Sequence, residues 1–310
     1  MKAKEPLAGG HGLLYKTSMK RSSHSFTRWA SIALLGVLTL SPLVVYAGTS
    51  PEEVKKFEEV KAKAEKGDAE AQMWLGWHYL NGEGVVKDSE QVAIWWRKSA
   101  EQGHEVSINN LAGFYFRIKN RNVKDRTPED VAQAVFWWRK GAALGYPDCQ
   151  NEMARCYLYG NGAEKDMVQA VSWFRKAAEQ GHEQSQHDLG GCYARGEGVD
   201  KDMAQAVSWY RKAADQGYGY AQYELAGCYA TGEGVHKDEV EVYAYYNLAG
   251  AKDANWWSRE SREKVAELEK KLSREEIAAG QKRARELQKV IDDKEAAKEA
   301  AKIAAKKAGK

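Results

Sequence analysis

The feature that most constrains the fold is a unit of 36 residues that recurs along the chain. Each unit follows a glycine and contains a helix-like run, a turn and a second helix-like run. These glycines are spaced by 36, 42, 36 and 36 residues, and they are Gly67, Gly103, Gly145, Gly181 and Gly217. One helical pair of this length cannot bury its apolar face alone, so neighbouring units are expected to stack into a solenoid.

Within each unit, both expected helices carry a repeated apolar pattern. In the first helix, Ala71, Leu75, Gly76 and Tyr79 fall on one face, and the same positions recur in later units. In the second helix a tryptophan recurs, and we expect this ladder to form the core: Trp95, Trp137, Trp173 and Trp209, each followed by another aromatic residue. An aspartate after each Gly-x-Gly turn is the expected N-cap of the second helix, at Asp88, Asp166, Asp202 and Asp238.

The repeated pattern reads A-x-x-x-L-G-x-x-Y-x-x-G-x-G-V-x-K-D, followed by A-x-x-W-[YF]-R-K-A-A-x-Q-G, and covers about Pro51 to Asp253. It resembles the Sel1-like repeat, a relative of the tetratricopeptide repeat. The resemblance implies an all-α fold: a right-handed α/α superhelical solenoid of about five repeats with helical caps. It also implies a scaffold or adaptor that binds other proteins.

The repeats divide the rest of the chain into segments. Residues 48–66 read as an N-terminal cap helix, 67–253 as the repeats, 254–290 as C-terminal capping helices and 291–310 as a Lys/Ala-rich tail. Ser273 and Glu276 have the spacing of a capping box at a helix start. The tail is expected to be a solvated helix, or to make transient contact with an anionic surface.

Residues 1–47 read as an N-terminal extension and an export signal, with translation starting at Met1 or at Met19. A basic stretch ending at Arg28 precedes the apolar run Ile32–Leu40, and Ala47-Gly48 offers a cleavage site. We therefore expect a periplasmic or secreted protein. The alternative is an uncleaved inner-membrane anchor, because 29–47 approaches the ~20 residues that a membrane span needs.

The sequence gives no convincing catalytic, cofactor or metal site. Cys149 and Cys156 are seven residues apart on one helix, about 10 Å, which exceeds the ~7 Å reach of a disulfide. Cys156, Cys192 and Cys228 occupy one slot in three successive repeats, so free or buried thiols are expected, unlike the disulfide-stapled members of the family. His182 and His187 are five residues apart and point to different sides of a helix, so they cannot share a zinc ion.

Two places are candidate partner-binding sites. The first is the side of the first helices opposite the core stripe, where the candidates are Trp74, Trp77, Asn110 and Arg155. The alternative for the two tryptophans is packing against the N-terminal cap helix. The second is a basic segment where the second unit is six residues longer and lacks the Gly-x-Gly turn, with Arg117, Lys119, Arg121, Lys124 and Arg126. The alternative there is a solvated insertion.

These observations favour an exported scaffold or adaptor with an unknown protein or peptide partner in the cell envelope. The near balance of 47 basic and 44 acidic residues does not demand nucleic acid as a partner, and we expect none. We expect no enzymatic activity and no small-molecule cofactor. The alternatives are a membrane-tethered envelope assembly factor and, less favoured, a cell-wall or β-lactam-binding hydrolase.

Overall fold

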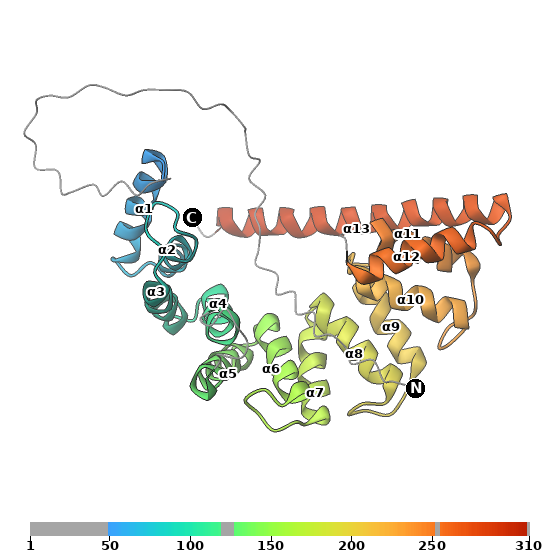
Figure 1. The fold of residues 1–310 in the computed structure, drawn as a ribbon, viewed down its shortest axis with the longest axis horizontal. Helices are drawn as coiled ribbons and strands as arrows, with labels where there is room; N and C mark the ends of the chain where they lie inside the picture. The colour runs from blue at the N-terminus through green and yellow to red at the C-terminus, as the bar shows by residue number, and fades with distance from the viewer. Residues whose placement is uncertain (1–48, 119–126, 252–254, 309–310) are drawn as a thin grey trace, which may run out of the picture. The chain divides into compact units, whose positions relative to one another are not determined.

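The computed structural model describes residues 49–118, 127–251 and 255–308, and every regular element among them is a helix (Figure 1). The expected all-α solenoid of Sel1-like repeats is confirmed. The predicted export signal lies outside the described residues. Of the helices that are described, none is both long and apolar enough to cross a membrane.

The helices alternate between the first and the second position of each repeat. The first helices are α2 (Ala69–Asn81), α4 (Glu105–Gly113), α6 (Pro147–Tyr159), α8 (Glu183–Arg195) and α10 (Gly219–Thr231). The second helices are α3 (Ser89–Glu101), α5 (Pro128–Ala143), α7 (Met167–Glu179), α9 (Met203–Ala214) and α11 (Glu239–Ala251). Before them lies α1 (Pro51–Ala64), and after them come α12 (Trp256–Leu268) and α13 (Arg274–Ala308). From α1 to α12, each helix contacts the next along the chain, α12 also contacts α10, and α13 packs on α11 (Figure 1).

Turn chemistry sets the helix ends as the sequence predicts. Gly196 ends α8 in the left-handed conformation, with φ of 70°. The side chain of each predicted aspartate accepts hydrogen bonds from backbone N–H groups in the first turn of its helix, which confirms all four as N-caps. The capping box is also confirmed, because Glu276 N–H donates to Ser273 Oγ and Ser273 N–H donates to Glu276 Oε2.

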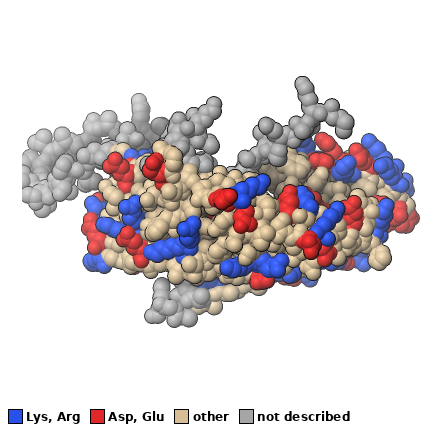
Figure 2. Space-filling view, turned by 90° about the horizontal axis from the view of Figure 1, so that it is seen from below, with Lys and Arg blue, Asp and Glu red and all other residues tan. Residues whose placement is uncertain are grey.

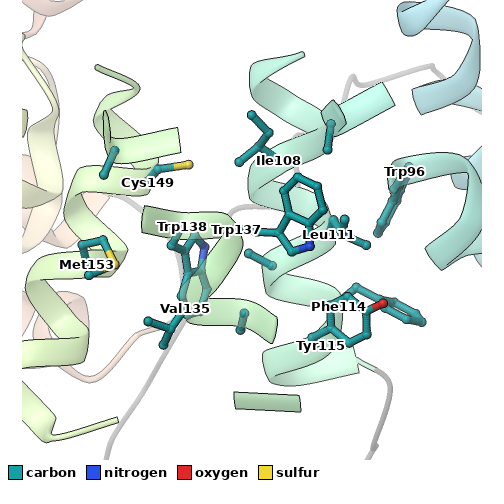
Figure 3. Packing of buried hydrophobic residues seen from close by; sticks show 14 of the residues in the cluster. Trp96, Ile108, Leu111, Phe114, Tyr115, Val135, Trp137, Trp138, Cys149 and Met153 are labelled. Carbon is teal, nitrogen blue, oxygen red and sulfur yellow. The ribbon is translucent and has the colours of Figure 1, made fainter. Parts of the chain in front are cut away.

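The two consecutive aromatic residues of each second helix differ in how deeply they are buried. The second member is buried: Trp96, Trp138, Phe174 and Tyr210 are at most 4% exposed, and Figure 3 shows Trp96 near Phe114 in one part of this core. The first member is covered on one side by a lysine three residues later, at 4.0 Å for Lys176 on Trp173. Trp95 and Trp137 are buried as predicted, whereas Trp173 and Trp209 are half-buried and pack against the edge of the core.

Glutamines tie the two helices of a repeat together. Buried Gln150 donates to the carbonyl of Ala142 and accepts from Gln180, and the same arrangement recurs at Gln72 with Gln102 and at Gln186 with Gln216. In the second repeat the corresponding residues are Ile108, which is fully buried, and Leu144. The polar link is thus replaced by two apolar residues in the repeat whose turn also departs from the pattern.

The second repeat and the C-terminal helix depart from simple repetition. Instead of a Gly-x-Gly turn, α4 continues into a π-helical segment, η1 (Phe114–Ile118). Helix α13 runs past position 290 without a break, and Lys294 and Lys298 contact Asp215 and Gln216 at the end of α9. The described side chains of α13 beyond Ile291 are all exposed.

Candidate partner-binding face

The candidate site is a face formed by the first helices and continued by α12, here called the binding face. A slot is the set of equivalent positions in successive repeats. Two slots define the face, and they lie four and seven residues after the slot that contains Glu70. The first slot holds Trp74, Asn110, Glu152, Asp188, Glu224 and Glu260, and the second holds Trp77, Gly113, Arg155, Gly191, Gly227 and Glu263. The slot of Glu70 is occupied by Tyr220 in α10 and by Trp256 in α12, and both residues border this face.

At the N-terminal end of the face, the two predicted tryptophans differ. Trp74 is 41% exposed and presents open aromatic surface. Trp77 is half-buried and packs against the core cluster that contains Trp96. The cap helix α1 instead contacts α2 through Phe57, whose ring meets the rings of His78 and Tyr79 edge-on. Asn110 is half-buried on α4.

In the middle of the face, charged side chains follow one another across the repeats. Arg117 extends from η1 and pairs with Glu152 of α6, with Nη2 3.0 Å from Oε1 and 3.2 Å from Oε2. Burial disfavours the charged form of Arg155, but the carboxylates of Glu152 and Asp188 outweigh it, so the pKa of this guanidinium is raised. Lys119, Arg121, Lys124 and Arg126 of the predicted basic segment lie outside the described residues.

At the C-terminal end, aromatic rings gather from α8, α10 and α12. His187 stacks on Tyr220 at a centroid distance of 4.5 Å, and Tyr220 stacks on Trp257 at 5.4 Å. Trp256 meets Tyr220 and Tyr223 edge-on, and it remains 50% exposed. These rings form a continuous aromatic surface beside the first slot.

Acidic residues accompany these rings. Burial raises the pKa of the Glu224 carboxyl, while His187 and Arg195 act in the opposite direction. Burial and a hydrogen bond to Glu260 raise the pKa of the Tyr223 hydroxyl, which donates to that carboxylate. A hollow of about 360 Å³ lies against α12, lined by Trp256, Arg259, Glu260, Glu263, Lys264 and Glu267.

The predicted side of the first helices includes Glu224 of α10, but the sequence analysis did not extend it to α12. The signal was present, because Glu260 follows Glu152, Asp188 and Glu224 at the same spacing of 36 residues. Helix α12 lacks the rest of the repeat pattern, so its contacts with α10 and α11 are what show that it continues the face. The predicted residues Trp74, Asn110 and Arg155 do lie on the binding face, and Arg117 reaches it through Glu152.

The close approach of His182 and Ser185 at the start of α8 is explained by helix capping. Backbone N–H of Ser185 donates to Nδ1 of His182, so this ring nitrogen is the N-cap acceptor of α8. The Nε2 atom of His182 then faces Oδ1 of Asp148 at 3.2 Å. Ser185 is fully buried and its hydroxyl donates to Asn151, so this hydroxyl is not presented as a nucleophile.

Comparison with known proteins gives the family. The Sel1 repeat model matches residues 69–104, 124–146, 147–182, 183–218 and 219–253, more than half of the chain. It skips all of α4 and the segment after it, where the second repeat departs from the pattern. Comparison with curated proteins gives no match.

A solved structure shows the same architecture. A Sel1 repeat protein from Oxalobacter formigenes is 29% identical, with a TM-score of 0.54 over 65% of this chain and 83% of that chain. The protective antigen c5321 of uropathogenic Escherichia coli, described as displaying an SLR fold, is 26% identical, with a TM-score of 0.47 over 78% of this chain and 58% of that chain. Sel1 repeat proteins generally mediate protein–protein interactions, and their scaffold is typically non-enzymatic. The protein described here belongs to the Sel1 repeat family.

Proposed function

We propose that the protein is an exported scaffold that binds a protein or peptide segment on the binding face. The observation that carries this proposal is the contrast between neighbouring slots of the first helices. The core slot is apolar and buried in every repeat: its residues are at most 1% exposed, and they are Leu75, Leu111, Met153, Leu189 and Leu225. The adjoining slot changes from Trp74 to Glu224, which packing does not require.

The charges on the face support recognition of a specific partner. Arg117 donates hydrogen bonds to Glu152, so its guanidinium group is oriented before a partner arrives, and the carboxylates of Glu152 and Asp188 favour the charged form of Arg155. A partner that offers hydrogen-bond acceptors to Arg155 and an apolar group to Trp74 would use chemistry already in place. Such preorganisation lowers the entropy that binding costs.

The proposed location of the scaffold in the cell is based on residues 1–47, whose basic and apolar runs read as an export signal. We propose that the protein acts in the cell envelope after cleavage near Gly48. Fractionation of cells, with N-terminal sequencing of the mature chain, tests this. Recovery in the membrane fraction with the signal intact would favour the tethered alternative.

Binding is tested by affinity capture from the native envelope with the mature chain as bait. Trp74→Ala and Arg155→Ala should each reduce recovery of the partner, because both side chains lie on the binding face. The matched control is Phe136→Ala on α5, which removes an aromatic ring that is 58% exposed on a second helix. Equal recovery with all three variants would contradict the proposal that this face binds the partner.

A further inference from the structure

The α10–α12 end of the binding face differs from the rest in whether its acidic residues have ion-pair partners. Glu152 has Arg117 as an ion-pair partner, and Oδ1 of Asp188 lies 3.0 Å from Nδ1 of His187. Within the described part of the chain, Glu224, Glu260 and Glu263 form no ion pair within 4 Å. Among the described residues, three carboxylates at this end of the face therefore lack a direct ion pair, and Glu224 has cationic groups, His187 and Arg195, near enough to act against the rise in its pKa.

Aromatic rings border these carboxylates on α10 and α12. Trp256 lines the same hollow as Glu260 and Glu263, and half of its surface is exposed. Tyr223 donates to Glu260 and meets Trp256 edge-on at 5.6 Å, which holds the carboxylate next to the indole. A carboxylate beside an open aromatic ring suits a cation with an apolar stem, because the charge pairs with the acid and the ring attracts it as well.

There is room for such a group on this face. An added Cβ at Gly227 would meet no atom within 4 Å, so the space in front of α10 is open there. Glycine in a helix interior costs roughly 1 kcal/mol relative to alanine. Neither packing nor backbone conformation requires glycine at this position, which is consistent with a requirement for open space.

Three cations have to be weighed against this, Arg195 of α8 and two on α12. Arg195 acts on Glu224 but is itself paired with Glu197, with Nε 2.9 Å from Oε2. Lys264 lies 3.7 Å from Glu267, so those two charges offset each other. Arg259 lines the hollow and offsets one further carboxylate. Together with Glu224 on α10, the acidic residues still outnumber the cations at this end of the face.

We propose that this end of the binding face docks a cationic peptide segment, whose lysine or arginine side chains lie between Trp256 and the carboxylates of Glu260 and Glu263. The proposal rests on the proposed function and specifies the chemistry of the partner. The charge complementarity of the face identifies a basic polypeptide as the occupant.

The test uses a fluorescein-labelled peptide of alternating lysine and alanine, with a glutamate–alanine peptide for comparison, and measures anisotropy against the full mature chain. The lysine peptide should bind and the glutamate peptide should not. The double variant Glu260→Gln/Glu263→Gln should bind about tenfold more weakly and lose much of its salt dependence, because two charges are removed without loss of shape. Trp256→Ala should bind several-fold more weakly, and Trp256→Phe should recover part of the affinity.

The matched control is Glu101→Gln/Glu179→Gln, which removes two exposed charges from the second helices α3 and α7 and should leave binding unchanged. Equal binding of the two peptides, binding of neither, or equal effects of the two double variants would each overturn the proposal. Self-association of the wild type that Glu260→Gln/Glu263→Gln abolishes would assign the face to a second copy and also overturn it. Because Trp74 and Arg155 lie at other parts of the face, partner capture that depends on them could stand while the cationic-peptide proposal fails.

Discussion

The Nε2 amide of Gln180 donates a 2.8 Å hydrogen bond to Oε1 of Gln150, joining the end of α7 to the buried face of α6. Gln150 in turn donates to the carbonyl of Ala142 in the preceding repeat. The second repeat replaces both glutamines, with Ile108 and Leu144. The two positions thus change character together, as expected when one partner alone would leave a buried polar atom without a hydrogen bond.

This pairing predicts strongly non-additive substitutions. Gln180→Leu should lower the free energy of unfolding by about 1–2 kcal/mol, because Oε1 of buried Gln150 loses its donor. Adding Gln150→Ile should restore most of the loss, because Ala142 keeps a backbone hydrogen bond from Gly145. Urea titration of the single and double variants measures the coupling. Simple addition of the two losses would show that the amides act independently.

The aromatic pair of α7 gives a second prediction. Phe174→Ala should destabilise the protein by about 3–5 kcal/mol, because the ring is fully buried and its loss leaves a cavity. Trp173→Ala should cost clearly less, because Trp173 is half-buried and covered on one side by Lys176. Denaturant titration of both variants provides the comparison. A larger loss for Trp173→Ala would place the core on the other side of the helix.

Repetition explains which parts of this fold the sequence could predict. The spacing of glycines and aspartates located the helices and their N-caps, because these residues act through local backbone geometry. The pattern could not predict which of Trp173 and Phe174 is more deeply buried. Both aromatic residues recur at every repeat, and tertiary packing decides which of the two ring positions is covered.

The binding face was predicted in part for a related reason. Trp74 and Arg155 were found because they depart from a repeated slot. Trp256 and Glu260 were missed because α12 keeps only the spacing of 36 residues and lacks the rest of the repeat pattern, so its contacts with α10 and α11 are needed to place it on the face. The glutamine link joins residues 30 positions apart and likewise depends on the packed helices.

The four cysteines are predicted to resist modification in the folded protein. All four are free and buried, as expected from their spacing. Burial raises the pKa of the Cys156 thiol to about 12 and that of Cys192 to about 11, so the reactive thiolate is scarce at neutral pH. Iodoacetamide should label none of them until denaturant is added, and then all four. Mass spectrometry gives the count, and rapid labelling without denaturant would contradict the buried placement.

Glu224→Gln should stabilise the protein at neutral pH and have little effect in acid. Burial raises the pKa of this carboxyl, so the folded state binds its proton more tightly than the unfolded state does. The free energy of unfolding of the wild type therefore falls as the pH rises from the unfolded value of 4.5 through the folded pKa. Urea titrations across this pH range measure the difference, with Glu179→Gln as an exposed control. A constant difference at all pH values would exclude titration of Glu224 as its cause.

Two helical glycines should respond in opposite ways to alanine. At Gly227 an added Cβ meets no atom within 4 Å, so Gly227→Ala should stabilise the protein by about 0.5–1 kcal/mol through the better helix propensity of alanine. At Gly190 the same Cβ would lie 2.7 Å from the ring of Tyr210, which is buried between helices, so Gly190→Ala should destabilise it. Thermal unfolding of the two variants decides the matter. Because Gly190 is required by packing and Gly227 is not, a stabilised Gly227→Ala protein with weakened peptide binding would show that the open space serves a partner, whereas destabilisation would show that this glycine serves the fold.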